Sequence, residues 1–109
     1  MIRFENDLTT VAERRLLAVL LREPDSIRHV QKLAPGEFSH ALHGELCRAI
    51  LAVIDAGETM NYANVVKHLH HRMKRVPAGW LSYLLDLGLC YCDPINVGYY
   101  AAVMRWGTK

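Results

Sequence analysis

The segment KHLHHRMKR, residues 67 to 75, gathers four cationic side chains and three histidines into nine consecutive positions. Such residues serve three kinds of chemistry: metal coordination by imidazoles, binding of phosphate or carboxylate groups, and hydration of an exposed helix face. At helical period, Leu69 and Met73 fall on one side of the segment and Lys67, His71 and Lys74 on the opposite side. The pattern therefore favours the solvated face of an amphipathic helix.

An alternative is that this face binds an anion or a nucleic acid, because several donors project from one surface. The residues that would carry such a site are Lys67, His71, Arg72, Lys74 and Arg75. A metal site is disfavoured. His68 and His71 lie one turn apart, but no acid or thiol in the next turn completes the ligand set that zinc requires.

The chain shows no motif of an enzyme. The phosphate-binding pattern GxxxxGK[ST] is absent, as are GxGxxG and GxSxG. His40, His43, Glu45 and Cys47 suggest a nucleophile with its base, but Cys47 lies beside a buried helical stripe with no evident oxyanion donor. We expect no catalytic residue, no cofactor and no metal.

Size and composition indicate one small globular domain. The chain has 109 residues, about half of them apolar, and a net charge of +2, which is too weak to attract nucleic acid by itself. No apolar run approaches the roughly 18 residues of a membrane span, and the acidic N-terminus is unlike a secretory signal. Three cysteines without a CxxC spacing predict free thiols. We expect a cytoplasmic protein.

Helical period runs through nearly the whole sequence and predicts an all-α fold, a compact bundle of about six helices. Thr10 and Glu13 form a capping-box pattern before a first helix that ends near Leu21, and Asp25 begins a short second helix. We expect Ser39 to cap the third helix and Gly57 to follow its end. Its predicted buried stripe consists of Leu42, Leu46, Ala49, Ile50 and Val53.

The second half of the chain predicts three more helices. Asn61 caps the fourth, whose inward residues are expected to be Tyr62, Val66, Leu69 and Met73. After Pro77 a fifth helix carries the apolar residues Trp80, Leu81, Leu84, Leu85 and Leu87. The pair Asp93–Pro94 begins the sixth, which turns toward the core the residues Val97, Tyr100, Ala101 and Met104.

Five short motifs in order resemble the N-terminal domain of the DnaB-type replicative DNA helicases over about residues 8 to 105. The first is Ala12-Glu13 with the following leucine pairs to Leu21, and the second is Glu37-Phe38 with His43. The third runs from Gly57-Glu58 through Asn61 and Val65 to Leu69. The fourth is Gly79 with Tyr83-Leu84 and Leu87, and the fifth is Asn96-Val97 with Tyr100-Ala101 and Val103. One departure concerns partners, because residues 73 to 77 are basic where the family is usually acidic.

The resemblance implies a non-catalytic interaction domain over residues 8–106, after an N-terminal tail at 1–7. Its implied partners are the C-terminal domain of primase, a helicase loader and other helicase subunits, with a weak homodimer expected. From the motif matches, Tyr83 and Leu84 are expected near a partner face. Val97 and Tyr100 are expected near a subunit-pairing hairpin, of which residues 94–106 would be the truncated start.

Overall fold

The computed structural model describes residues 8–30, 33–73, 78–89 and 96–107, and within these ranges the chain is helical with no strand. Its elements are α1 (Leu8–Arg22), the 3-10 helices η1 (Pro24–His29) and η2 (Pro35–Glu37), then α2 (Ala41–Asp55), α3 (Tyr62–Arg72), α4 (Ala78–Leu89) and α5 (Val97–Gly107). The all-α prediction is confirmed. No helix in the described ranges is long and apolar enough to cross a bilayer.

The predicted count of six helices is wrong by one, because the second is a 3-10 helix and five are α-helices in the described ranges. Pro24 stands in its first turn, and Glu23, the residue before it, makes no side-chain cap. The Val30 N–H bonds to the Ile27 carbonyl, three residues back, as 3-10 geometry requires.

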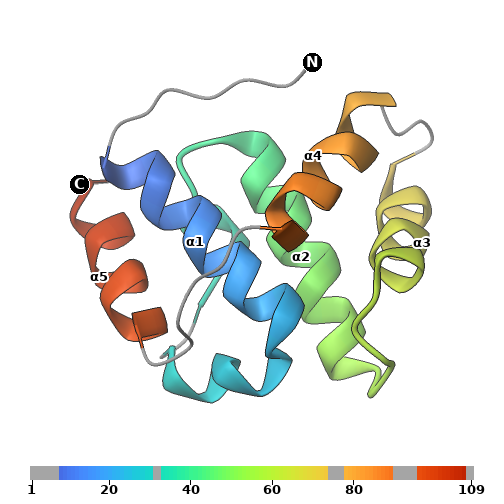
Figure 1. The fold of residues 1–109 in the computed structure, drawn as a ribbon, viewed down its shortest axis with the longest axis horizontal. Coiled ribbons are helices and arrows are strands. Elements are labelled where there is room, and N and C mark those ends of the chain that lie inside the picture. Colours follow the sequence, from blue (N-terminus) through green and yellow to red (C-terminus); the bar gives the residue numbers. More distant parts are fainter. Residues whose placement is uncertain (1–7, 31–32, 74–77, 90–95, 108–109) are drawn as a thin grey trace.

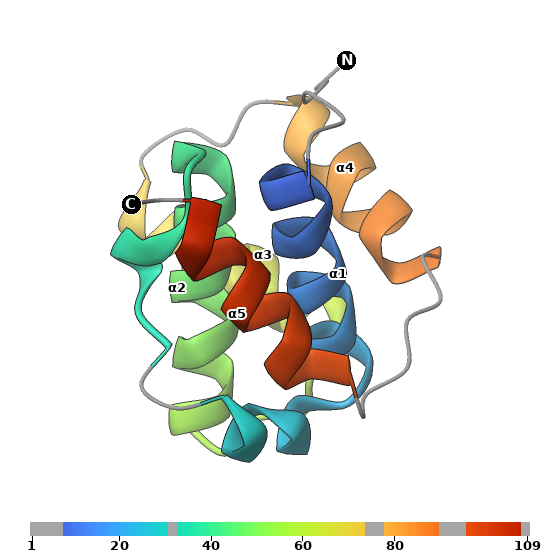
Figure 2. The same ribbon diagram turned by 90° about the vertical axis from the view of Figure 1, so that its left-hand side faces the viewer.

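Helix α1 runs through the middle of the bundle. Two views at right angles show α5 on one side of it, α2 beside it and α4 on the other side, with α3 packed against α2 (Figures 1 and 2). Five consecutive side chains of α1, residues 16 to 20, are buried. A helix that is apolar on every side is stable only when neighbours surround it, so this leucine-rich stretch places α1 at the centre.

Helix α2 is buried along the predicted stripe, since Leu46, Ala49, Ile50 and Val53 all belong to the core and Leu42 packs against it. Its C-terminus confirms the prediction for Gly57, which has a φ of 68°. The N–H groups of Gly57 and Glu58 return to the carbonyls of Ile54 and Val53, a Schellman motif.

Two predicted N-terminal caps are wrong. Thr10 lies inside α1 rather than at its start, and the Glu13 carboxylate reaches a distant part of the chain instead of capping α1. Ser39 does not cap α2, whose N-cap position is occupied by His40. Tertiary bonds engage these side chains instead: the Ser39 N–H and hydroxyl donate to Glu13, and the Thr10 hydroxyl is hydrogen-bonded to His40 Nε2 at 3.0 Å.

Helix α3 begins as predicted, because the Asn64 N–H donates to the Asn61 side chain at 2.8 Å. Its inward face is rotated from the prediction. Val65 and Leu69 are buried, Val66 is partly buried, and Tyr62 is 38% exposed. The apolar stripe that α3 turns toward the core is therefore narrower than the four predicted residues suggested.

The last two helices differ in how many of their apolar residues are buried. In α4, Leu84 and Leu87 are buried and Trp80 packs against the core, but Leu81 and Leu85 are exposed. In α5, all four predicted inward residues are buried. The predicted start of that helix at Asp93–Pro94 lies outside the described residues.

We expect Gly57→Ala to lower the free energy of unfolding by about 1–2 kcal/mol, because alanine pays a steric cost at positive φ. The matched control is Gly36→Ala in η2, where an added Cβ meets no atom within 4 Å. Urea unfolding followed by circular dichroism measures both. Equal stability of the two variants would contradict the assignment of Gly57 as the helix terminator.

Candidate interaction surfaces

The basic face of α3 is largely paired with acids. Lys67 forms an ion pair with Glu58, and His68 Nε2 donates to the same carboxylate at 2.7 Å. Arg72 Nε donates to Glu45 of α2 at 2.8 Å. The bonds from Lys67 and His68 hold the pKa of Glu58 below its ordinary value. These pairs remove much of the positive field that the sequence suggested.

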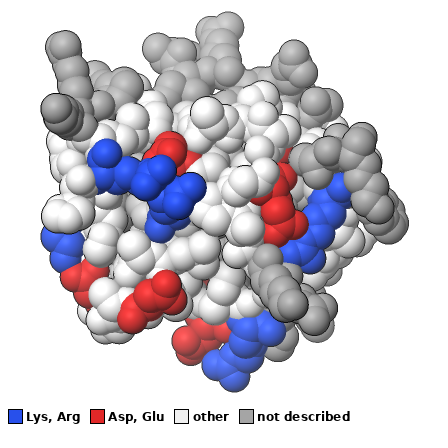
Figure 3. All heavy atoms as spheres, turned by 180° about the vertical axis from the view of Figure 1, so that it is seen from behind, with Lys and Arg blue, Asp and Glu red and all other residues white. Residues whose placement is uncertain are grey.

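The other three residues of the predicted anion site differ in whether the structure describes them. His71 is exposed on α3, whereas Lys74 and Arg75 lie outside the described residues. In the space-filling view from behind, blue and red side chains neighbour one another and no wide field of one sign covers the described residues on that face (Figure 3). A helix face of this kind is most simply a solvated one, with its charges mutually screened.

Neither a metal site nor a nucleophile is assembled in the described ranges. No group of three or more His, Cys, Asp and Glu side chains converges there to hold a metal ion. Burial raises the pKa of the Cys47 thiol to about 12, so the thiolate that a nucleophile requires does not form near neutral pH. His43, which the sequence places near Cys47, is bonded elsewhere.

His43 lies at the centre of a buried chain of hydrogen bonds. Its Nδ1 donates to Glu13 Oε1 at 2.7 Å, and the Tyr83 hydroxyl donates to its Nε2 at 2.6 Å. The other oxygen of Glu13 accepts from the N–H and the hydroxyl of Ser39, at 2.8 and 2.5 Å. Glu13, His43 and Tyr83 are all buried. The Glu13–His43–Tyr83 chain therefore ties α1, α2 and α4 together.

Within these hydrogen-bonded side chains, the pKa shifts favour an ionised Glu13 carboxylate beside a neutral His43 imidazole. Burial raises the pKa of Glu13, but the hydrogen bonds from His43 and Ser39 together outweigh it and hold that pKa below its ordinary value. Burial lowers the pKa of His43, and the attraction of Glu13 offsets this only in part. Neutral His43 then carries its proton on Nδ1, which leaves Nε2 free to accept from Tyr83.

The four residues expected near partners are all in the core. Leu84 and Val97 are fully buried, and Tyr83 and Tyr100 are nearly so. The Tyr83 hydroxyl is used by His43, and the Arg15 guanidinium lies 6.0 Å from the centre of the Tyr100 ring. In this chain these side chains support the fold, and a direct contact with a partner through them stays a prediction.

An exposed leucine ridge on α4 was not predicted from the sequence. Leu81, Leu85 and Leu89 are spaced four residues apart on one side of the helix and are 50%, 44% and 81% exposed. The signal was present in the composition, because α4 has more apolar residues than one inward face can bury. An exposed apolar stripe on a helix is typical of a protein–protein contact.

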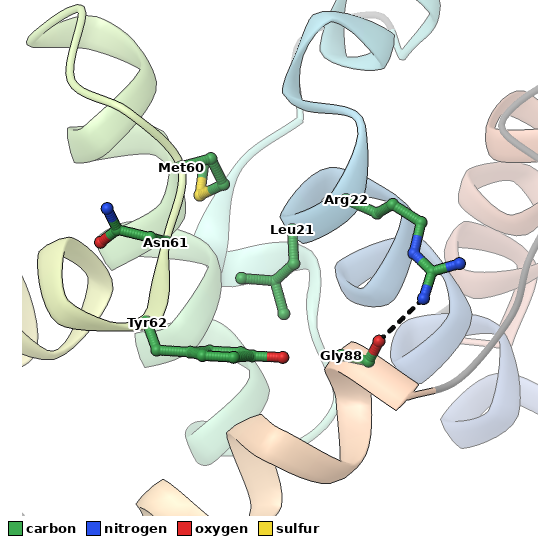
Figure 4. Close-up of a pocket in the computed structure, with 6 residues that line it drawn as sticks. All are labelled: Leu21, Arg22, Met60, Asn61, Tyr62 and Gly88. Carbon is green, nitrogen blue, oxygen red and sulfur yellow. Dashed lines mark hydrogen bonds between the residues drawn. The ribbon is translucent and has the colours of Figure 1, made fainter.

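A pocket of about 260 Å³ opens beside the end of this ridge, lined by Leu21, Arg22, Met60, Asn61, Tyr62 and Gly88. Figure 4 shows the Tyr62 hydroxyl pointing toward Gly88 with the Leu21 side chain beside the ring, and Arg22 donating to the Gly88 carbonyl at 3.0 Å. A Cβ on Gly88 would stand 1.7 Å from the Tyr62 hydroxyl. Glycine at position 88 is therefore what allows the tyrosine to approach α4.

Comparisons with known proteins agree with this architecture. The family model described as DnaB-like helicase N terminal domain matches residues 6–105. The crystal structure of the N-terminal domain of DnaB helicase from Mycobacterium tuberculosis superposes with a TM-score of 0.78 at 30% identity, covering 94% of this chain and 72% of that one.

Two curated proteins are similar over 95 residues, or 86% of this chain. They are the replicative DNA helicase DnaB of Geobacillus stearothermophilus, 29% identical, and the replicative DNA helicase DnaC of Bacillus subtilis, 26% identical. The chain spans 21% of the length of each.

Replacing Tyr83 by phenylalanine removes the hydroxyl that bonds His43 Nε2 and leaves a buried nitrogen without this donor. We expect a loss of about 1–3 kcal/mol in the free energy of unfolding, measured by urea titration. Tyr99→Phe, on an exposed ring of α5, is the matched control and should change stability by less than about 0.5 kcal/mol. Identical losses from both variants would contradict the buried bond.

Stability should also fall as the solution is acidified from about pH 7 to pH 5. Because the pKa of His43 is lower in the folded chain than its ordinary value of 6.5, the unfolded chain takes up a proton first, and the equilibrium shifts toward unfolding. Below about pH 4.5 Glu13, whose pKa is also lowered, adds to the loss.

Thermal unfolding measured across this pH range tests the effect. His43→Gln should be less stable at pH 7 but show a shallower decline toward pH 5. The exposed His70→Gln is the control and should keep the original slope. A slope unchanged by His43→Gln would contradict the role of the imidazole.

Proposed function

Because the chain belongs to the DnaB-like helicase N-terminal domain family, we propose that it is a non-catalytic protein-interaction domain of a replicative DNA helicase. In this role it helps helicase subunits to assemble and receives the C-terminal domain of primase or a helicase loader. Such a domain works in the cytoplasm with the rest of the replication machinery.

The observation that carries the proposal is the leucine ridge on α4. Its three side chains stand on a helix whose opposite face is fixed in the core by Leu84 and Leu87, so the ridge is presented on a rigid support. Fully burying one leucine is worth about 1.5–3 kcal/mol. Three partly exposed leucines in a row supply the few apolar anchors on which helix-on-helix binding depends.

Nucleic-acid binding through the basic face of α3 has weaker support. Lys67 and Arg72, two of its five proposed residues, already pair with Glu58 and Glu45. A phosphate would have to displace these carboxylates, which costs part of the energy that the contact yields. Protein contact is therefore the function that the described surface favours.

A charge in the middle of the ridge tests the proposal. We expect Leu85→Asp to weaken binding to the primase C-terminal domain or to the loader at least about tenfold in isothermal calorimetry. Because the Leu85 side chain is 44% exposed, the variant should fold normally, and its circular dichroism spectrum should match that of the unmodified chain.

The matched control is Leu8→Asp, at the exposed start of α1, where an acid favours the helix and binding should persist. The proposal fails if the unmodified chain has no affinity for primase, loader or helicase. The placement of the contact on the α4 ridge is wrong if both aspartate variants bind as tightly as the unmodified chain.

A further inference from the structure

A second surface with a different chemistry lies between α2 and α3. The two helices form a groove of about 180 Å³, and each contributes side chains at helical spacing. From α2 these are Glu45, Arg48, Ala49 and Ala52, and from α3 they are His68, Leu69, His71 and Arg72. The groove is thus a seam between two packed helices, with the ridge of α4 on neither wall.

The floor and the rim of this groove differ in polarity. Ala49 and Leu69 are buried and Ala52 is half-buried, which gives a floor that is aliphatic and shallow. The rim is cationic, because Arg48 and Arg72 are exposed there beside exposed His71. Glu45 is the single acid among the lining residues. A ligand for this groove needs negative charge at its edge and an aliphatic group at its centre.

The two arginines differ in whether they are already paired with an acid. Arg72 Nε donates to Glu45 Oε2 at 2.8 Å across the groove. Arg48 pairs with no acid in the part of the chain that the structure describes. An incoming carboxylate therefore finds one guanidinium open, and it reaches the second only by displacing Glu45, which costs part of the energy of that second contact.

We infer that the α2/α3 groove binds an acidic amphipathic helix of a partner protein, with its carboxylates on Arg48 and Arg72 and an aliphatic side chain on the alanine–leucine floor. The inference deepens the proposed function, on which it rests, by naming the chemistry of one partner segment. Guanidinium groups bind carboxylates through paired hydrogen bonds, and a seam between two helices accepts a third helix.

A protein helix fits this groove better than single-stranded nucleic acid does. Binding of single strands relies on aromatic side chains that stack on bases, and none of the lining residues is Phe, Tyr or Trp. The carboxylates of Glu45 and Glu58 beside the groove also repel a continuous phosphate backbone. Isolated carboxylates on a helix can be spaced to avoid both acids.

The experiment uses the full chain and a short synthetic helix with glutamates on one face and leucines on the other. A second peptide has glutamine in place of each glutamate, and oligothymidylate is the nucleic-acid probe. Binding is measured by fluorescence anisotropy at low and at high salt. We expect the acidic peptide to bind most tightly, with affinity falling as salt rises.

Three variants separate the groove from a general charge effect. Arg48→Gln should weaken binding of the acidic peptide about tenfold. Glu45→Gln should strengthen it several-fold, because it releases Arg72 without adding a cation. Arg28→Gln in η1, which removes an exposed cation paired with Asp25, is the matched control and should leave binding unchanged.

The inference is overturned if the acidic peptide does not bind, if the glutamine peptide binds equally well, or if oligothymidylate binds more tightly. It is likewise overturned if Arg48→Gln and Arg28→Gln have the same effect. These outcomes do not depend on the α4 ridge, because Leu85→Asp leaves the groove intact. Loss of primase or loader binding and loss of acidic-peptide binding are therefore distinguishable.

Discussion

The fold depends on the burial of one carboxylate. Glu13 lies on the central helix α1, and its ionised form is tolerated only because His43 and two groups of Ser39 donate to it. His43 in turn accepts from Tyr83 of α4. Each of these groups is satisfied in one relative placement of α1, α2 and α4, and a buried charge without its donors is strongly destabilising. The chain of bonds thereby selects this packing, and with it the side of α4 that faces outward.

The sequence allowed the local features to be predicted, because local physics decides them. Asn61 caps α3, Gly57 ends α2 at positive φ, and the stripe through Leu46 and Ile50 is buried. The resemblance also led to the correct family, and its motif residues Glu13, His43 and Tyr83 prove to be bonded to one another. Their meeting was not predicted, since 30 and 40 residues separate them along the chain.

The failures have a common physical origin. Thr10 and Glu13 match a capping box, yet tertiary contacts of Thr10 with His40 and of Glu13 with Ser39 override that local pattern. On α4, leucine occurs on both the buried and the exposed side, so the sequence pattern does not tell Leu84 from Leu85. Pairing of Arg72 with Glu45 joins residues 27 positions apart, and the sequence therefore overstated the positive field of α3.

We propose that the two outer surfaces divide the work of recognition. In this proposal the apolar ridge of α4 would provide affinity, and the groove between α2 and α3, which is rimmed by cations, would provide selection by charge. Their separation on different helices would let one domain contact two segments of a partner, or two partners, at the same time.

Amide hydrogen exchange of the whole chain, with and without a saturating concentration of the primase C-terminal domain or the loader, tests the central claim most directly. A domain that acts through its outer surface should show slower exchange in α4, around residues 81 to 89, when one of these proteins is bound. Exchange unchanged throughout the chain with both proteins present would contradict the account.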